Sequence, residues 1–382
     1  MAVQRGGGSG GAGGGVAAGG DGCVRGGEGE VAGGGAGPRG AVEGCVRGGA
    51  VTQYYDDGQV TLLHGDVREV LRELQADSVN CVVTSPPYWS LRDYGVERQL
   101  GLEPAPEEYV ANMVEVFREV RRVLRKDGTL WLNIGDSYSS GGRGYYDASP
   151  GANKGNHVAR NRPRAPYGMK PKDLVGIPWM LAFALRADGW WLRQDIIWSK
   201  PNPMPESVRD RCTRAHEYLF LLSASDRYWS DFGAIREPAG YPSERPQNSF
   251  AREQPDIPLQ KPQKRKNRTA RPGIDTHGGA QGNGYMEYPA DTRNRRSVWH
   301  IPTAPFPEGH FATFPPALVE PCILAGCPEG GIVLDPFIGS GTTAMVARQL
   351  GRRAIGIDLN GDYLEMAVRR IGAQMALIGE VV

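Results

Sequence analysis

The chain of 382 residues has few cysteines, no long apolar run and almost no net charge. Its six cysteines form no Cys-x-x-Cys pair, so we expect reduced thiols, as in a cytosolic protein, and no metal site. No stretch approaches the roughly 18 apolar residues of a membrane helix, and the N-terminus lacks the apolar core of a secretory signal. We therefore expect a cytoplasmic protein without membrane association. The net charge of +1 means that any basic surface must be local.

Glycine, by contrast, is abundant, and it is concentrated at the start of the chain. Residues 1–51 are mostly Gly, Ala and Val, and the hexapeptide Gly-Cys-Val-Arg-Gly-Gly occurs at 22–27 and again at 44–49. Such a segment buries too little apolar surface to offset its backbone entropy, so we predict a disordered tail. An assigned translation start that lies too far upstream would produce the same pattern.

The first motif follows a short apolar run, residues 79–83, which predicts a buried strand of a parallel sheet. Two consecutive prolines cannot continue a strand, because neither has an N–H group to donate. The result is a stiff turn at the carboxyl end of a strand, where open α/β sheets bind ligands. It presents a hydroxyl, a carbonyl and an aromatic ring, which suit a flat base with an exocyclic amine, although a plain turn after a core strand fits as well. The residues are Ser85, Pro86, Pro87 and Tyr88.

The second motif is a glycine loop between two predicted strands, 331–335 and 354–358. The loop reads Asp335-Pro336-Phe337-Ile338-Gly339-Ser340-Gly341-Thr342-Thr343 and opens a helix that we expect to reach residue 350. Glycines let the backbone approach a ligand, the helix N-terminus favours an anion, and an acid after the next strand accepts from ribose hydroxyls. That acid is Asp358.

Three cofactors compete for this loop. A phosphate-binding P-loop requires a lysine before Thr342, and the chain has none there. A dinucleotide fold fits the spacing of Gly339, Gly341 and Ala344, but too few residues follow Asp358 to complete its sheet. S-adenosyl-L-methionine remains as the third candidate.

With both motifs in view, the chain resembles the DNA amino-methyltransferases, which methylate cytosine N4 or adenine N6. Ser-Pro-Pro-Tyr is similar to their catalytic motif, and Asp-Pro-Phe-x-Gly-Ser-Gly-Thr-Thr to their cofactor loop. The catalytic strand precedes the cofactor strands, which is the permuted order of the family's β group, found in restriction-modification systems and in phage or orphan enzymes. The resemblance covers about residues 58–374. It implies an α/β fold with a doubly wound, mostly parallel Rossmann-like sheet that is circularly permuted, and S-adenosyl-L-methionine as the cofactor.

The resemblance also assigns roles. It implies catalytic roles for Ser85, Pro86, Pro87 and Tyr88. It implies cofactor binding by Asp66, Asp335, Phe337, Gly339, Gly341, Thr342, Thr343 and Asp358. Asp66 would lie beside the adenosine. It follows Gly65 after the strand 60–64, so a plain N-cap of the next helix is the alternative. The turn after the strand 190–198 would place Lys200 and Asn202 near the pocket.

A polar, basic segment spans residues 241–297, with eleven Lys or Arg against six Asp or Glu. A local cationic segment in a neutral protein is typical of phosphate binding, and an unstructured linker is the alternative. We predict DNA contacts by Lys264, Arg265, Lys266 and Arg268, because the family inserts a target-recognition region here. The expected domains are the tail 1–51, a catalytic half 52–240, this insertion 241–297 and a cofactor-binding half 298–376.

Other expected elements are helices at 67–74, 106–125, 177–187 and 310–324 and strands at 129–134, after a turn at Asp127-Gly128, and at 218–222. The two halves should join side by side, with Ser85 and Gly339 at adjacent strand ends.

The predicted activity is site-specific methylation of the N4 amine of a cytosine flipped out of double-stranded DNA. In the family, serine at the first motif position accompanies cytosine N4, and Asp or Asn usually accompanies adenine N6, which stays the main alternative. Carbon-5 methylation would need a cysteine nucleophile. Cys322 follows a proline, but we expect it in the core. A non-catalytic binding module is a further alternative, and a restriction endonuclease acting separately is a possible partner.

Overall fold

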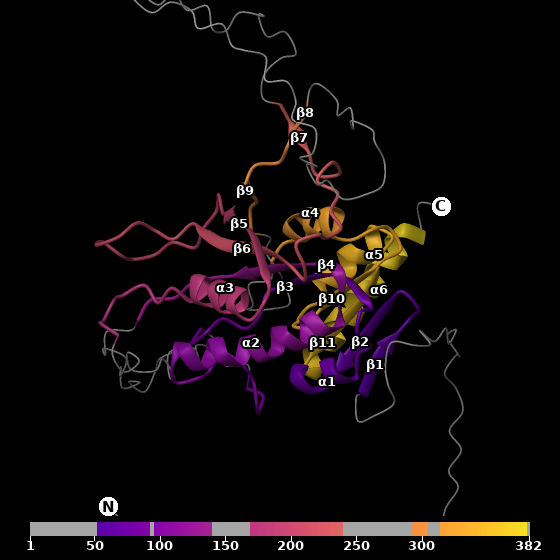
Figure 1. Cartoon of the computed structure of the whole chain (residues 1–382), viewed down its shortest axis with the longest axis horizontal. Coiled ribbons are helices and arrows are strands. Elements are labelled where there is room, and N and C mark those ends of the chain that lie inside the picture. The colour runs from indigo at the N-terminus through magenta and orange to yellow at the C-terminus, as the bar shows by residue number, and fades with distance from the viewer. Residues whose placement is uncertain (1–51, 92–94, 140–168, 240–291, 304–313, 380–382) are drawn as a thin grey trace, which may run out of the picture. The chain divides into compact units, whose positions relative to one another are not determined.

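A computed structural model describes residues 52–91, 95–139, 169–239, 292–303 and 314–379 (Figure 1). The predicted tail 1–51 and most of the segment 241–297 lie outside these ranges. The strands are β1 (Thr52–Asp56), β2 (Val60–His64), β3 (Val79–Thr84), β4 (Leu124–Ile134), β5 (Trp191–Ser199), β6 (His216–Ser223), β7 (Glu237–Pro238), β8 (Thr292–Arg293), β9 (Val298–His300), β10 (Ile332–Asp335) and β11 (Arg353–Asp358). The helices are α1 (Val67–Glu73), α2 (Pro106–Val123), α3 (Ile177–Ala187), α4 (Pro316–Gly326), α5 (Thr342–Gln349) and α6 (Gly361–Gly379).

One sheet holds nine of these strands, in the order β1-β2-β11-β10-β3-β4-β6-β5-β9. Its centre is parallel from β2 to β4, and β9 runs parallel to β5. Only β1 and β6 run against the other strands of this sheet. The predicted doubly wound, mostly parallel fold is therefore confirmed.

The six helices of the described ranges cover both faces of the sheet, three on each (Figure 1). One core lies between the sheet and α1, α2 and α3, and the other between the sheet and α4, α5 and α6. Successive side chains of a strand point to opposite faces of the sheet, so each central strand contributes to both cores. On β4, Leu130 and Leu132 lie in the first core and Trp131 lies in the second. A central strand buried on both faces explains why the sequence shows continuous apolar runs here.

The two halves of the chain interleave, so the prediction that they lie simply side by side was wrong in one respect. The cofactor strands β10 and β11 lie between β2 and β3. β2 pairs with β11, and β3 pairs with β10, so the connection through α1 passes over two strands of the other half. The strands that end before Ser85 and before Gly339 were correctly predicted to be adjacent, because β3 and β10 are neighbours.

Two element boundaries also differ from the predictions. β4 begins at Leu124, because Leu124 pairs with Val79, and a register shift then accommodates the residues before Thr129, where a turn was expected. α4 begins at Pro316 and not near residue 310. Pro315 is extended, as expected before a second proline, and Pro316 occupies the first turn, where its missing N–H costs nothing.

A two-stranded ribbon closes the base of the predicted insertion. β7 and β8 pair with each other, so residues 238 and 292 are neighbours. Glu237 accepts from Arg293 and Arg296, both at 2.8 Å. The segment between these strands therefore leaves and re-enters the described structure at one point.

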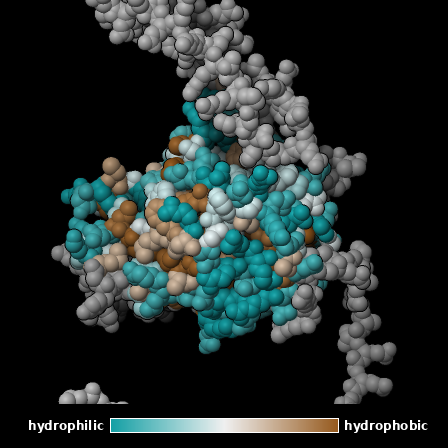
Figure 2. All heavy atoms as spheres, viewed as in Figure 1, coloured by the Kyte–Doolittle hydropathy of each residue, from teal (hydrophilic) through white to brown (hydrophobic). Residues whose placement is uncertain are grey.

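The face in Figure 2 is mixed, with many hydrophilic residues between smaller groups of hydrophobic ones. None of the helices in the described ranges combines the length and apolar character needed to cross a membrane.

Candidate active site

The carboxyl ends of the central strands open into a cavity of about 570 Å³. The turn after β3 and the glycine loop after β10 meet there. Thr84 and Asp335 are 251 positions apart in the sequence, and the Thr84 hydroxyl donates to the Asp335 carboxylate at 2.6 Å. Wall residues come from both halves of the chain, including Ser85, Tyr88, Lys200, Glu217, Phe337, Gly339 and Asp358. The fold thus assembles one site from the two motifs.

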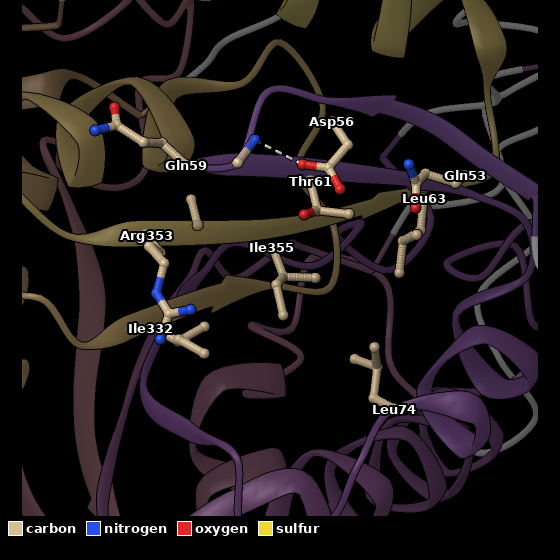
Figure 3. A pocket seen from close by; sticks show the side chains of 11 residues that line it. Gln53, Asp56, Gln59, Thr61, Leu63, Leu74, Ile332, Arg353 and Ile355 are labelled. Carbon is tan, nitrogen blue, oxygen red and sulfur yellow. Dashed lines mark hydrogen bonds between the residues drawn. The ribbon is translucent and has the colours of Figure 1, made fainter. Parts of the chain in front are cut away.

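A second hollow lies at the opposite edge of the sheet, where β2, β10 and β11 begin (Figure 3). Its lining includes Gln53, Asp56, Leu63, Leu74, Arg353 and Ile355. Its volume of about 20 Å³ is enough for about one water molecule. The larger cavity is therefore the one that can hold a cofactor and a base.

The turn Ser85–Tyr88 is fixed from several sides. The Tyr109 hydroxyl donates to the Pro87 carbonyl at 2.8 Å, which holds the second proline against α2. A Cβ at residue 135 would lie 2.6 Å from the Tyr88 ring, so glycine at this position leaves the space that the ring occupies. Ser85, Pro86 and Tyr88 all line the cavity.

Tyr88 belongs to a polar network that the sequence did not reveal. Its hydroxyl donates to Glu217 at 2.7 Å, and Asn133 donates to both partners, at 3.2 Å to Tyr88 and 2.9 Å to Glu217. Lys200 forms an ion pair with the second oxygen of Glu217. The one available signal was an acid at the start of an otherwise apolar strand, which by itself is no motif.

The glycine loop carries the second half of the site. Gly339 and Gly341 have φ values of +49° and +83°, and Gly341 precedes the first turn of α5. Asp358 accepts backbone N–H groups of Gly339 and Asn360, at 2.9 and 2.8 Å. Burial raises the pKa of Asp358 to about 6 despite these donors. Of the residues predicted to bind the cofactor, Phe337, Gly339, Thr342 and Asp358 line the cavity.

Three of the predicted cofactor residues support the cavity from behind its wall. Asp335 is buried and accepts from Thr84, from Thr343 and from the Phe337 N–H. Burial raises its pKa to about 6. Gly341, Thr343 and Asp335 are absent from the cavity lining, so their geometry supports the loop and not direct ligand contact.

Asp66 is both a cavity residue and a helix cap. It lies in the lining, accepts the Arg68 N–H as the N-cap of α1, and pairs with the side chains of Arg68 and Arg98. Its pKa is lowered by hydrogen bonds from Arg68 and by both arginine charges, which outweigh its burial. The capping role that the sequence left open is therefore present in the structure.

The predicted DNA-binding residues divide into two groups. Lys200 and Asn202 lie in the cavity lining, but both have partners within the chain. Asn202 exchanges two hydrogen bonds with the Thr303 backbone, at 2.9 and 3.2 Å. Lys264, Arg265, Lys266 and Arg268 lie outside the described residues.

Cys322 is a core residue, as predicted. Its thiol is fully buried and lies 3.1 Å from the Leu318 carbonyl, and burial raises its pKa well above the usual range. A buried, protonated thiol outside the cavity is no nucleophile. The described residues hold no cluster of three or more potential metal ligands.

The cavity fits S-adenosyl-L-methionine. A buried carboxylate with a raised pKa, Asp358, offers an acceptor for ribose hydroxyls, and its charge would gain from such donors. The N-terminus of α5 favours the carboxylate of a methionine moiety. Phe337 and Ile338 form an apolar part of the lining, on which a purine ring could pack.

Comparisons with known proteins agree with this geometry. Residues 79–369 match the family model described as DNA methylase, N6_N4_Mtase. The chain is 47% identical over 310 residues to the type II methyltransferase M.SmaI of Serratia marcescens, covering 81% of this chain and 90% of that protein. It is 46% identical over 311 residues to M.Cfr9I of Citrobacter freundii, covering 81% and 87%. Among solved structures, the PvuII DNA methyltransferase (cytosine-N4-specific) aligns with a TM-score of 0.53 at 16% identity, over 84% of this chain and 88% of that one.

Proposed function

Because the chain belongs to the DNA methylase family of N6 and N4 amino-methyltransferases, we propose that it methylates the N4 amine of cytosine at a specific DNA site. The family membership makes the protein an S-adenosyl-L-methionine-dependent DNA methyltransferase of the restriction-modification type. The base and the atom that it methylates are the proposal. The observation that carries it is Ser85 at the first position of the catalytic turn, on the wall of the shared cavity.

Two acceptors of the turn are suited to hold an exocyclic amine. Such an amine is a poor nucleophile, because its lone pair is delocalised into the ring. The Ser85 hydroxyl and the Pro86 carbonyl accept its two N–H groups and draw it towards a tetrahedral geometry, which localises the lone pair. Acceptors held in fixed positions on the cavity wall contribute positioning and electrostatic stabilisation to the reaction.

The remaining site residues bind and orient the two reactants. Tyr88 stacks on the flipped base, since an aromatic face accepts any base. Asp358 binds the ribose of the cofactor, the glycine loop and the start of α5 approach its methionine part, and Phe337 packs on its adenine. When bound, the cofactor supplies an activated methyl group. Asp335, Thr84 and Thr343 hold the loop against the catalytic turn.

The DNA partner engages the basic insertion in this proposal. The cationic segment 241–297 emerges at the β7–β8 ribbon, next to β9 and the edge of the sheet. Its predicted contacts, Lys264, Arg265, Lys266 and Arg268, bind phosphates and read the site. As with other type II methyltransferases, a restriction endonuclease with the same site would act separately, in the cytoplasm that holds the DNA.

Adenine N6 is the second candidate, because the same acceptors fit its amine. Nothing in the cavity volume separates the two bases, and only the serine at position 85 favours cytosine through the family pattern.

The test is nucleoside mass spectrometry. Amplified DNA of known sequence, which contains no methylated cytosine or adenine, is incubated with the enzyme and isotope-labelled S-adenosyl-L-methionine. Label in N4-methylcytosine is the expected result. Label in N6-methyladenine would keep the fold and the mechanism but refute the choice of base, and absence of label from DNA would refute the proposal as a whole.

A further inference from the structure

Glu217 is a carboxylate in the cavity lining, beside the catalytic turn, and it belongs to neither sequence motif. It lies at the start of β6 with its side chain 16% exposed, and its ion-pair partner Lys200 is 17% exposed. Three donors reach it, namely the Tyr88 hydroxyl, the Asn133 amide and the Lys200 ammonium group. Burying a carboxylate to this degree is costly unless it is paired, so three donors on one acid indicate a function for its charge.

The carboxylate fixes the direction of the hydrogen bonds around it. An ionised carboxylate only accepts, so the Tyr88 hydroxyl must donate to Glu217. The Tyr88 oxygen then accepts from Asn133 at 3.2 Å and from the Ser85 hydroxyl at 3.4 Å. With its proton directed at Tyr88, Ser85 is left with lone pairs for another donor.

We propose that Glu217 is a positioning residue for methyl transfer: acting through Tyr88, it orients the Ser85 hydroxyl as an acceptor for the exocyclic amine of the target base. This inference rests on the proposed role of Ser85. It holds for either base, because the amines of cytosine and adenine are both donors.

Two further features support this role. Burial, and then the charge of Glu217, raise the pKa of Tyr88 well above its ordinary value, so the phenol keeps the proton that it donates. Lys200 offsets the charge of Glu217 and also lies 4.2 Å from the centre of the Trp198 ring. Lys200 is thereby committed to the network, which accounts for its position better than a DNA phosphate contact does.

Replacing the acid by its amide tests the direction of these bonds. Glu217→Gln keeps the shape but can donate to Tyr88, which lets the tyrosine proton turn towards Ser85. We expect about a tenfold lower rate at saturating DNA and cofactor, equal to about 1.4 kcal/mol, with unchanged dissociation constants for both. Glu217→Asp, which keeps the charge, should recover part of the rate. Glu119→Gln removes the acid of another partly buried ion pair, Arg122–Glu119 on α2, and should leave the rate unchanged.

A double-mutant cycle separates this role from general support of the site. Tyr88→Phe keeps the stacking ring but removes the hydroxyl through which Glu217 acts. If the inference is correct, Glu217→Gln causes no further loss of rate in the Tyr88→Phe background. The inference would be overturned if the rate losses of the two single variants multiplied in the double variant, or if Glu217→Gln alone left the rate unchanged.

The final readout needs neither DNA nor cofactor. Tyrosine labelled with ¹³C at Cζ is titrated by NMR in the free protein, with the resonance of Tyr88 assigned by its loss in Tyr88→Phe. Glu217→Gln should lower the pKa of Tyr88, because a negative neighbour is removed, whereas Glu119→Gln should not. An unaltered Tyr88 titration would refute the coupling even if the protein methylated no DNA. A shifted titration together with label in N6-methyladenine would retain Glu217's role and refute only the choice of cytosine.

Discussion

Ser85 is the residue on which the proposed chemistry most directly depends. Ser85→Ala removes one of the two acceptors for the amine, so we expect a loss of about a hundredfold or more in methylation rate. Among the described residues, its hydroxyl makes one weak hydrogen bond, to Tyr88 at 3.4 Å, so folding and cofactor binding should persist. Tritium transfer to DNA measures the first effect, and thermal unfolding and calorimetry measure the others.

Ser78→Ala is the matched control for this substitution. It also removes a serine hydroxyl, one that donates to the Gln75 carbonyl in a turn before β3, outside the cavity lining. A rate for Ser85→Ala within a few-fold of this control would contradict the role of Ser85.

Asp358 predicts a pH dependence of cofactor binding. Its pKa of about 6 in the free protein lies above the ordinary value of 3.8, because burial disfavours the charged form. Ribose hydroxyls donate best to the ionised carboxylate, so cofactor affinity should rise as pH increases through 6. We expect the dissociation constant of the cofactor to be about tenfold lower at pH 7 than at pH 5, measured by calorimetry.

Asp358→Asn cannot ionise and should bind the cofactor weakly and with little change between pH 5 and 7. A pH dependence in this variant equal to that of the native protein would assign the titration to another group. The stability of the free protein has the opposite trend. A raised carboxyl pKa stabilises the fold below about pH 3.8, and this contribution is lost as pH rises through about 6.

At the scale of an element, the start of α5 depends on Gly341. This residue has a φ of +83°, and a Cβ placed there would lie 2.8 Å from Ala367 on α6. Gly341→Ala therefore combines backbone strain with overpacking between two helices, and we expect a loss of about 2–4 kcal/mol in the free energy of unfolding. Urea denaturation of the free protein measures it.

Gly372→Ala is a control for which we expect a change of opposite sign in the free energy of unfolding. Gly372 lies within α6, and no other part of the described structure comes within 4 Å of a methyl group placed at this position. Alanine there should stabilise the protein by about 0.5–1 kcal/mol, since glycine is a poor residue within a helix. Equal changes in the free energy of unfolding for the two substitutions would contradict the close contact between Gly341 and Ala367.

For the whole molecule, the β7–β8 ribbon predicts that the insertion can be removed. Because residues 238 and 292 are already paired, replacing 240–291 by a short Gly-Ser linker closes a hairpin without displacing the sheet. We expect the shortened protein to fold and to bind S-adenosyl-L-methionine with native affinity, but to lose site-specific methylation of DNA.

Circular dichroism, calorimetry and sequencing of methylated sites measure these three properties. Retention of site-specific methylation would show that recognition resides elsewhere. Loss of cofactor binding would show that the insertion supports the sheet.

The sequence by itself determined the chemistry that lies within short segments. Proline geometry marks the end of β3 at Thr84, glycines and the acids at 335 and 358 mark a cofactor loop, and a buried thiol at Cys322 follows from its apolar helix. These features are local, because backbone restrictions and hydrophobic periodicity act over a few residues.

Only the tertiary structure decided which distant segments share the cavity. Periodicity predicts strands but not their neighbours, so the position of β10 and β11 between β2 and β3 was not predictable. Glu217, Asn133 and Lys200 come from three separate strands or their ends, and pairing of β4, β5 and β6 brings them to Tyr88. A hydrogen-bond network of this kind has no signature in sequence, because its members are related by sheet register and not by spacing along the chain.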